Sequence, residues 1–292
     1  MTSAPAERVG GSLHALGESP VWSARDRALW FVDLRACALH RLDPASGATL
    51  RWTFPELVAG VVLAPQGRLA VALASRVVLF DPVSGTSAPL VTPEDPSLGN
   101  RLNETKGDRQ GRLWTSSMRD FAAATTGSLY RVERNRQVAR VLGPVTVPNG
   151  LAWSPDARTL YFADTPDGRL RAYEFDPATG AIGAMRVLCD AGVMPGKPDG
   201  AAVDADGCVW SARYGGGCVA RITPRGEVDR IVALPVTQVA SCAFGDADLR
   251  TLYITTARQR LDEDALAREP LAGALFALRV AVSGLPEVEL AL

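Results

Sequence analysis

Four residues with oxygen-bearing side chains recur at one position of a repeated pattern, and together they could hold a cation. Each of the six copies of the pattern has one residue, here called its anchor, that can be aligned with those of the other copies. The residues four positions before the anchors are Glu18, Ala59, Asn103, Asn149, Asp199 and Ala240. Two carboxylates and two carboxamides that converge without a lysine would repel one another unless protons or a cation neutralised the charge. An all-oxygen set of this kind suits a divalent ion such as Ca²⁺, Mg²⁺, Mn²⁺ or Zn²⁺.

The element that must position these residues occurs six times. A turn followed by an apolar or aromatic strand start recurs at RALWFVD, GRLAVAL, GRLWTSS, RTLYFAD, GCVWSAR and RTLYITT, at intervals of 40 to 49 residues. This period is typical of propeller blades. The 27 glycines and 20 prolines are spread along the chain, which indicates many turns between short strands, and only residues 261–269 favour a short helix.

We therefore predict an all-β fold, a six-bladed β-propeller that forms a single domain over residues 1–292. A propeller must close its ring, and residues 1–15 are the candidate segment that completes the last blade. The innermost strand of each blade begins beside the central channel, so the six aligned positions should surround one axis. The alternative is that polar residues simply line a water-filled channel, with Asn-Gly and Asp-Gly acting as turns.

Composition excludes several classes of function. The net charge of −1 gives no basic face for nucleic acid or an anionic membrane, and no run of 18 apolar residues predicts a membrane span. The start of the chain has no secretion signal, so we expect a cytoplasmic protein. Two histidines and no Gly-x-Ser-x-Gly motif argue against a serine hydrolase. Five cysteines without Cys-x-x-Cys spacing argue against a disulfide framework or a thiolate zinc site.

Four motifs around the aligned residues resemble the gluconolactonase and regucalcin family, which also includes the senescence marker protein, luciferin-regenerating enzyme and bacterial sugar-acid lactonases. LGESPVW resembles the family's leading glutamate motif, NRLNETKGDRQGRLW its Arg-x-Asn segment, VPNGLAWSPD its asparagine motif and PDGAAVDADGCVW its aspartate motif. The motifs occur in the family's order, and the resemblance extends from about Leu16 to the C-terminal region. The later segments FGDADLRTLYITTAR and LAGALFAL are most similar to the bacterial sugar-acid lactonases.

The resemblance implies a six-bladed propeller that holds one divalent metal cation through Glu18, Asn149 and Asp199. It leaves the identity of the ion open among calcium, zinc, manganese, magnesium and iron. It further implies a hydrolase whose partner is a small-molecule sugar lactone.

The resemblance also implies that Arg101 and Asn103 contact the sugar lactone. Two segments depart from the family pattern. The family commonly has Asn-Asp-Gly-Lys where this chain has Asn-Glu-Thr-Lys at 103–106, so that loop is expected to differ in shape. SSMRD replaces a more usual Gly-Thr-Met followed by an acidic residue, which makes Asp120 the candidate acidic residue of the substrate loop.

Hydrolysis of a sugar lactone to the aldonic acid requires a polarised carbonyl, a delivered water and stabilisation of the charged intermediate. A metal at the channel mouth supplies the first and the last by Lewis acidity. Asp199 is the candidate general base towards the water. The alternative function, from a different class, is a non-catalytic propeller that binds calcium or a protein partner.

Overall fold

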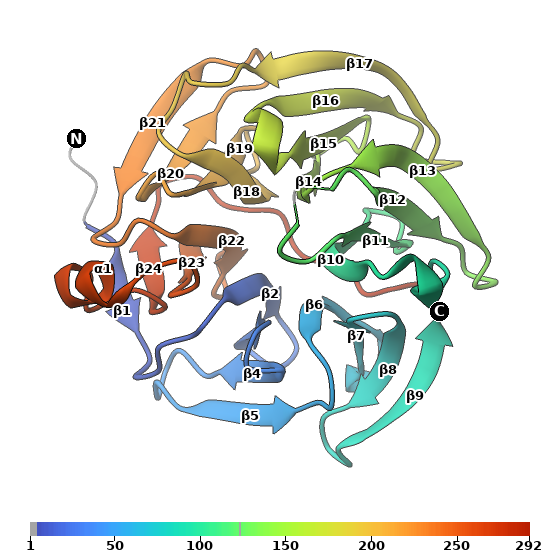
Figure 1. The fold of residues 1–292 in the computed structure, drawn as a ribbon, viewed down its shortest axis with the longest axis horizontal. Coiled ribbons are helices and arrows are strands. Elements are labelled where there is room, and N and C mark those ends of the chain that lie inside the picture. Colours follow the sequence, from blue (N-terminus) through green and yellow to red (C-terminus); the bar gives the residue numbers. More distant parts are fainter. Residues whose placement is uncertain (1–4, 123) are drawn as a thin grey trace.

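The computed structural model describes residues 5–122 and 124–292 as six four-stranded antiparallel sheets arranged in a ring (Figure 1). The first sheet contains β2 (Gly17–Ser23), β3 (Ala28–Asp33), β4 (Ala38–Leu42) and β5 (Thr49–Thr53). The second contains β6 (Val58–Leu63), β7 (Leu69–Leu73), β8 (Val77–Asp81) and β9 (Thr86–Val91). The third contains β10 (Arg101–Gly107), β11 (Leu113–Met118), β12 (Gly127–Val132) and β13 (Val138–Val145).

The second half of the chain repeats the arrangement. The fourth sheet contains β14 (Pro148–Trp153), β15 (Thr159–Asp164), β16 (Leu170–Phe175) and β17 (Ile182–Cys189). The fifth contains β18 (Lys197–Val203), β19 (Val209–Tyr214), β20 (Cys218–Ile222) and β21 (Val228–Ala233). The sixth contains β22 (Val239–Gly245), β23 (Thr251–Thr256), β24 (Leu275–Arg279) and the N-terminal strand β1 (Glu7–Val9). The predicted six-bladed β-propeller is confirmed.

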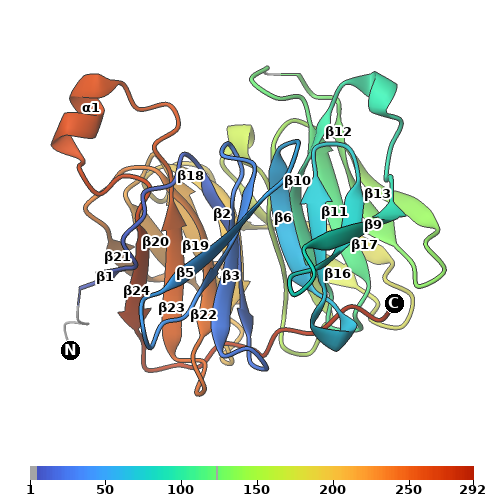
Figure 2. The ribbon, with the colours of Figure 1, turned by 90° about the horizontal axis from the view of Figure 1, so that it is seen from below.

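The two chain ends meet different parts of the ring. Strand β1 pairs antiparallel with β24, with Glu7 opposite Ala277, so it is the outermost strand of the sixth sheet. The segment after β24 crosses the lower face in Figure 2, where the amide of Leu290 donates to the carbonyl of Leu63 at 2.8 Å. Leu290 is buried there. The C-terminal segment therefore covers part of the channel end that is opposite to the starts of the inner strands.

Helices are short. The α-helix α1 (Glu263–Arg268) lies within the predicted range 261–269, and Asp262 caps it by accepting from the amide of Ala265. The 3₁₀ turns are η1 (Pro65–Gly67), η2 (Pro96–Leu98) and η3 (Thr165–Asp167). Among the described residues, none of the helices has the length and apolar character needed to cross a membrane.

A recurring turn sets the outer hairpins of three blades. The sequences DPASG, DPVSG and DPATG connect the third and fourth strands of the first, second and fourth sheets. In the first copy the Asp43 side chain accepts from the amide of Ala45, and Gly47 adopts a φ of 71° that glycine tolerates without strain.

Aromatic residues from the strand starts pack between blades. Trp114 contacts Trp153 of the next blade at 5.7 Å between ring centroids, and Trp210 contacts Phe244 at 6.0 Å. Trp114 and Trp210 are almost completely buried. These contacts join the third blade to the fourth and the fifth to the sixth, which holds the inner strands in place around the channel.

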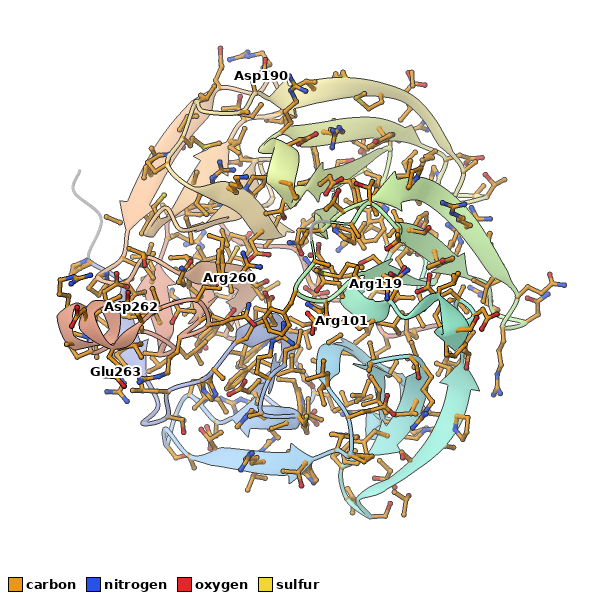
Figure 3. The ribbon with its side chains drawn as sticks, in the orientation of Figure 1. Arg101, Arg119, Asp190, Arg260, Asp262 and Glu263 are labelled. Carbon is orange, nitrogen blue, oxygen red and sulfur yellow. The ribbon has the colours of Figure 1, made fainter. Side chains whose placement is uncertain are left out.

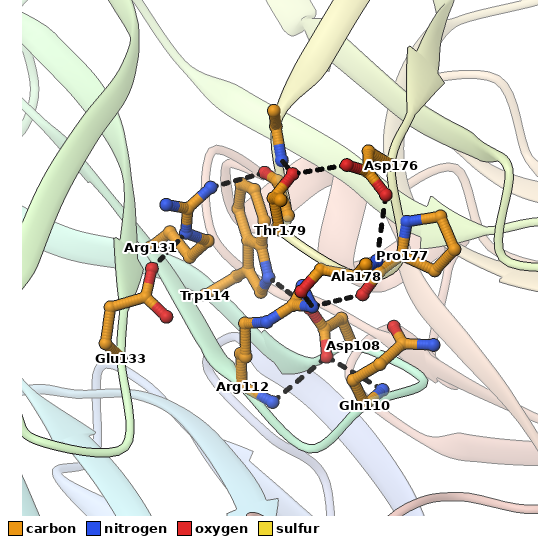
Figure 4. A network of polar contacts seen from close by, with 12 residues as sticks. Asp108, Gln110, Arg112, Trp114, Arg131, Glu133, Asp176, Pro177, Ala178 and Thr179 are labelled. Atoms are coloured by element: carbon orange, nitrogen blue, oxygen red, sulfur yellow. Dashed lines mark hydrogen bonds and ion pairs between the residues drawn. The ribbon is translucent and has the colours of Figure 1, made fainter.

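Buried aspartates anchor these tryptophans at the lower ends of the blades. In Figure 4 the Asp108 side chain accepts from the indole of Trp114 at 3.0 Å and from the guanidinium of Arg112 at 2.9 Å. Arg112 also donates to the carbonyls of Pro177 and Ala178 in the neighbouring blade, which joins two sheets through one network. The fifth sheet repeats the pattern.

In the fifth sheet, Asp204 is completely buried and accepts from Trp210 at 2.8 Å and from Arg221 at 2.7 Å. We expect Asp204→Ala to lower the free energy of unfolding by about 3 kcal/mol, because it leaves the indole and the guanidinium unpaired. Asp206→Ala is the matched control, since Asp206 also pairs with Arg221 but lies exposed. It should cost less than about 1 kcal/mol. Urea denaturation measures both variants, and equal losses would contradict this assignment.

Candidate functional site

The starts of the inner strands surround a cavity of about 220 Å³ at the upper end of the channel. All six residues that the sequence singled out as ligands or substrate contacts line it, namely Glu18, Arg101, Asn103, Asp120, Asn149 and Asp199. The remaining two aligned positions hold the buried residues Ala59 and Ala240. Figure 3 shows the label of Arg101 close to the centre of the ring, well inside the outer strands. The structure therefore brings every predicted site residue to one cavity.

A β-bulge occurs in the inner strand of each of the six sheets at the aligned position. In the first sheet the register shifts between Glu18 and Val21, and in the fourth it shifts between Asn149 and Ala152. The other four inner strands shift at Val58/Gly60, Leu102/Thr105, Pro198/Ala201 and Val239/Ser241. A bulge adds one residue to one strand and re-aims a side chain. The repeated bulge explains how polar side chains can leave apolar inner strands and face the axis.

The residue after the aligned position links neighbouring blades. The Ser19 hydroxyl accepts from the amide of Val61 at 3.1 Å, and the Glu104 carboxylate accepts from the amide of Leu151 at 2.9 Å. In the second, fourth and fifth sheets this position is glycine. Gly150 has a φ of 68°, and a Cβ on Gly200 would lie 2.1 Å from the hydroxyl oxygen of Ser241. The Asn-Gly and Asp-Gly pairs thus permit the bulge and the close approach of adjacent blades.

A chain of hydrogen bonds fixes the carboxamides. The Asn103 side-chain amide donates to the Asn149 carboxamide oxygen at 3.1 Å and to the carbonyl of Pro148 at 2.9 Å. The Asn149 amide in turn donates to the hydroxyl of Thr165 at 2.8 Å, and that hydroxyl donates to the carbonyl of Pro198. With its nitrogen engaged in this way, Asn149 keeps one lone pair of its oxygen for a further partner.

Three carboxyl groups share the channel, of which Asp199 is buried and Glu18 and Glu104 are largely buried. Burial, followed by the charge of Glu104, raises the pKa of Glu18 to about 8. Burial also raises the pKa of Glu104 to about 7, although Lys106 opposes this shift. The pKa of Asp199 is likewise raised well above its usual range, first by burial and then by the charges of Glu18 and Glu104. Each shift shows that the ionised form lacks sufficient compensation from the protein alone.

The residues present fit a divalent cation. Glu18 and Asp199 supply two desolvated carboxylates and Asn149 a carboxamide oxygen, which is a donor set of hard oxygens. Among the described residues, only the amide of Ser19 donates to the Glu18 side chain, at 3.3 Å. No cluster of three His, Cys, Asp or Glu side chains with metal-binding geometry occurs in the described part of the chain, so a carboxamide or water would have to complete the coordination.

The substrate-side residues form a separate cluster of charges. Asp120 accepts from both terminal nitrogens of Arg35, at 2.6 and 2.8 Å, and from the Nε of Arg101 at 2.9 Å. Partial burial acts to raise the pKa of Asp120, but the hydrogen bonds from Arg35 and Arg101 outweigh it and lower the pKa to about 2. Arg101 also donates to the Asn103 side chain at 2.8 Å. Asp120 therefore fixes Arg101 beside the predicted cation ligands.

Several side chains line the cavity at positions that the sequence motifs did not indicate. They are Arg35, Phe121, Thr165, Lys197, Tyr214, Gln259 and Arg260. Most of them lie at strand ends or in connecting loops. There, neither the repeat nor the spacing from the anchors predicts which way a side chain points. Thr165 directly follows β15, and its contact with Asn149 joins the ends of two adjacent strands of the fourth sheet. The Thr-Pro-Asp-Gly sequence around Thr165 indicates a turn and no binding function.

The model of the SMP-30/Gluconolactonase/LRE-like region matches residues 16–258. The chain belongs to this family. A relative from Pseudomonas putida, named 6-deoxy-6-sulfogluconolactonase, is 39% identical over 93% of this chain and 94% of its own length. A pentonolactonase from Haloferax volcanii is 36% identical over 93% of each chain. The crystal structure of regucalcin from Agrobacterium tumefaciens, described as a calcium-binding protein, is 29% identical, has a TM-score of 0.94 and covers 99% of this chain and 98% of its own.

The raised carboxyl pKa values predict a pH dependence of stability for the cation-free protein. Glu18 is ionised above its ordinary value of 4.5 in the unfolded chain but stays protonated to about 8 in the folded protein. Its contribution to the free energy of unfolding should therefore fall as the pH rises through this interval. Urea denaturation of EDTA-treated protein at about pH 5.5 and about pH 8 measures the loss.

Glu18→Gln should lose less stability over the same interval, because the carboxamide does not titrate. Glu227→Gln is the matched control, since Glu227 lies exposed and pairs only with groups on the outer surface. It should keep the pH dependence of the wild type. If the free energy of unfolding of Glu18→Gln fell with pH as steeply as that of the wild type, the assignment of a buried, uncompensated charge to this position would be contradicted.

Proposed function

We propose that the protein is a divalent-cation-dependent hydrolase of sugar lactones. The observation that carries this proposal is the convergence of two buried carboxylates and a carboxamide at one cavity, next to the fixed pair of Arg101 and Asp120. The names of the relatives from P. putida and H. volcanii, both lactonases, support the same reaction class.

The residues that would hold the cation are Glu18, Asn149 and Asp199. When bound, a divalent ion polarises the lactone carbonyl and stabilises the negative charge of the tetrahedral intermediate. Oxygen donors accept calcium, zinc, manganese, magnesium or iron, so availability contributes to which ion is used. The relative from A. tumefaciens is described as binding calcium, which favours calcium as the first ion to test.

Asp199 is the proposed general base. It would take a proton from a water as that water forms the new bond to the carbonyl carbon. The bond between the carbonyl carbon and the ring oxygen then breaks, and the ring oxygen receives the proton to give the hydroxyl of the aldonic acid. Asp199 must be ionised for the first step, and a positive charge beside it favours that state despite its burial.

Arg101 and Asn103 would orient the sugar. Arg101 uses Nε for Asp120 and Nη1 for the carbonyl of Leu102 and the side chain of Asn103, while Nη2 has no partner among the described residues. That terminal nitrogen is the donor proposed for a sugar hydroxyl. Because Asp120 and the backbone fix the guanidinium, little side-chain entropy is lost when the sugar binds.

We expect Asp199→Asn to lower kcat for aldono-lactone hydrolysis by at least about 100-fold, because it removes both a charged ligand and the general base. Acid release from a panel of aldono-γ- and δ-lactones measures the rate, with EDTA-treated protein supplied with each divalent ion. Asp190→Asn is the control, since Asp190 is exposed and Figure 3 labels it at the rim of the ring.

The control should retain the activity of the wild type. A non-catalytic calcium-binding propeller, the alternative, predicts that folded wild-type protein binds the ion but hydrolyses none of the lactones in the panel. That result, or full activity in Asp199→Asn, would overturn the proposal.

A further inference from the structure

We propose that the site accepts sugar lactones that carry an anionic substituent, such as a carboxylate, phosphate or sulfonate, bound by Lys197 and Arg260. The substituent would lie on the carbon chain away from the ring carbonyl. This inference rests on the proposed lactonase function and names the substrate class of the same cavity.

The distribution of charge in the cavity leads to this substrate class. Three acidic side chains and four basic ones line it. Glu18 and Asp199 are the buried acids that a divalent cation would neutralise, and Asp120 is shared by Arg35 and Arg101. These pairings leave the other two basic residues, Lys197 and Arg260, without an acidic partner among the residues that the structure describes. The net charge of the whole chain is −1, so these two cations do not reflect a general excess of positive charge in the protein.

Lys197 and Arg260 are the two unmatched cations. Lys197 begins β18, and within the part of the chain that the structure describes its ammonium donates only to the carbonyl of Pro166, which also lines the cavity. No hydrogen bond or ion pair of the Arg260 side chain occurs among the described residues. Both residues are exposed, whereas Glu18 and Asp199 lie deeper. In Figure 3 the label of Arg260 lies close to the centre of the ring, while Asp262 and Glu263 lie out at α1.

The loop that carries Arg260 is held firmly. The amides of Arg258 and Gln259 both donate to the carbonyl of Ala15, at 3.1 and 3.0 Å. The Tyr214 hydroxyl donates to the carbonyl of Gln259 at 3.1 Å, and Arg35 donates to the Gln259 side chain. These contacts come from residues next to the first blade, Ala15 and Arg35, and from Tyr214 of the fifth blade. They fix the backbone from which the Arg260 side chain extends beside the cavity.

An anionic group matches this arrangement better than a neutral sugar does. Hydroxyls can be bound by neutral amides and by groups that are already paired, and they require no unmatched cations. A phosphate, sulfonate or carboxylate gains charge-assisted hydrogen bonds from a guanidinium and an ammonium that have no competing carboxylate. The deeper acids would at the same time be engaged by the catalytic ion, so they would not repel the substituent.

The test compares an anionic lactone with its neutral counterpart in the same protein. We would measure kcat/KM for 6-phosphoglucono-δ-lactone and glucono-δ-lactone, with a saturating divalent ion. Calorimetry would give the Kd of 6-phosphogluconate and gluconate. We expect the wild type to prefer the phosphorylated compound by at least about tenfold at low salt in both assays. The preference should shrink as salt screens the exposed cations.

Arg260→Gln and Lys197→Gln should each reduce the preference by about fivefold to tenfold, because each removes one charged donor. Arg136→Gln is the matched control. Arg136 is likewise exposed, has a φ of 66° close to the 67° of Arg260, and lies in the hairpin between β12 and β13, away from the cavity. The Arg136→Gln variant lowers the net charge by the same amount as the other two substitutions. It should keep the wild-type preference for the phosphorylated compound.

Each outcome decides the proposal. The anionic subsite would be overturned if the wild type showed no preference for the phosphorylated compound, or if both Arg260→Gln and Lys197→Gln kept that preference. Neither result would contradict lactone hydrolysis itself. Hydrolysis of neither lactone by folded protein would instead overturn the proposed function. The binding constants would still decide the subsite in that case, because they do not depend on turnover.

Discussion

The cost of burying like charges at the top of the channel is the constraint on which the rest of the site depends. Glu18, Glu104 and Asp199 lie within reach of one another's charge, and burial raises the pKa of each. The ionised state of such a group of carboxyls is unfavourable unless a positive charge compensates it. The protein supplies Lys106 beside Glu104, but Glu18 and Asp199 face the cavity. Their arrangement is therefore suited to a ligand that brings positive charge.

The propeller meets this constraint through its repetition. The six blades converge at one axis, and a bulge in every inner strand re-aims the side chain that follows the strand start. Two of these positions remain alanine, which confines the polar groups to four blades and makes the cavity asymmetric. Buried aspartate–tryptophan pairs, such as Asp108 with Trp114, hold the blades at the other end. The paired polar groups of the lower face thus support an upper face that carries the charged cavity residues.

Much of this was predictable from sequence, because it depends on spacing. The repeat period predicted the six blades, and a constant offset from the anchors predicted that Glu18, Asn149 and Asp199 would share the axis. Loop-borne side chains were not predictable in the same way. Arg35 reaches Asp120 across 85 residues of sequence, and Arg260 lies in a connection whose path is fixed by contacts with other blades. Glu104 was recognised only as a departure in a loop, because its role depends on the amide of Leu151 in the next blade. Whether Asp199 acts as the general base remains a prediction.

The central claim is that the protons on the buried carboxyls and a divalent cation compete for the same oxygens. The most direct test is to titrate Ca²⁺ into lightly buffered, cation-free protein near pH 7 and to count the protons released per ion bound. The account predicts the release of about one proton or more per ion, falling towards zero by about pH 9.5, where Glu18 is ionised before the ion arrives. Binding without proton release near neutral pH, or the same release in Glu18→Gln as in the wild type, would contradict it.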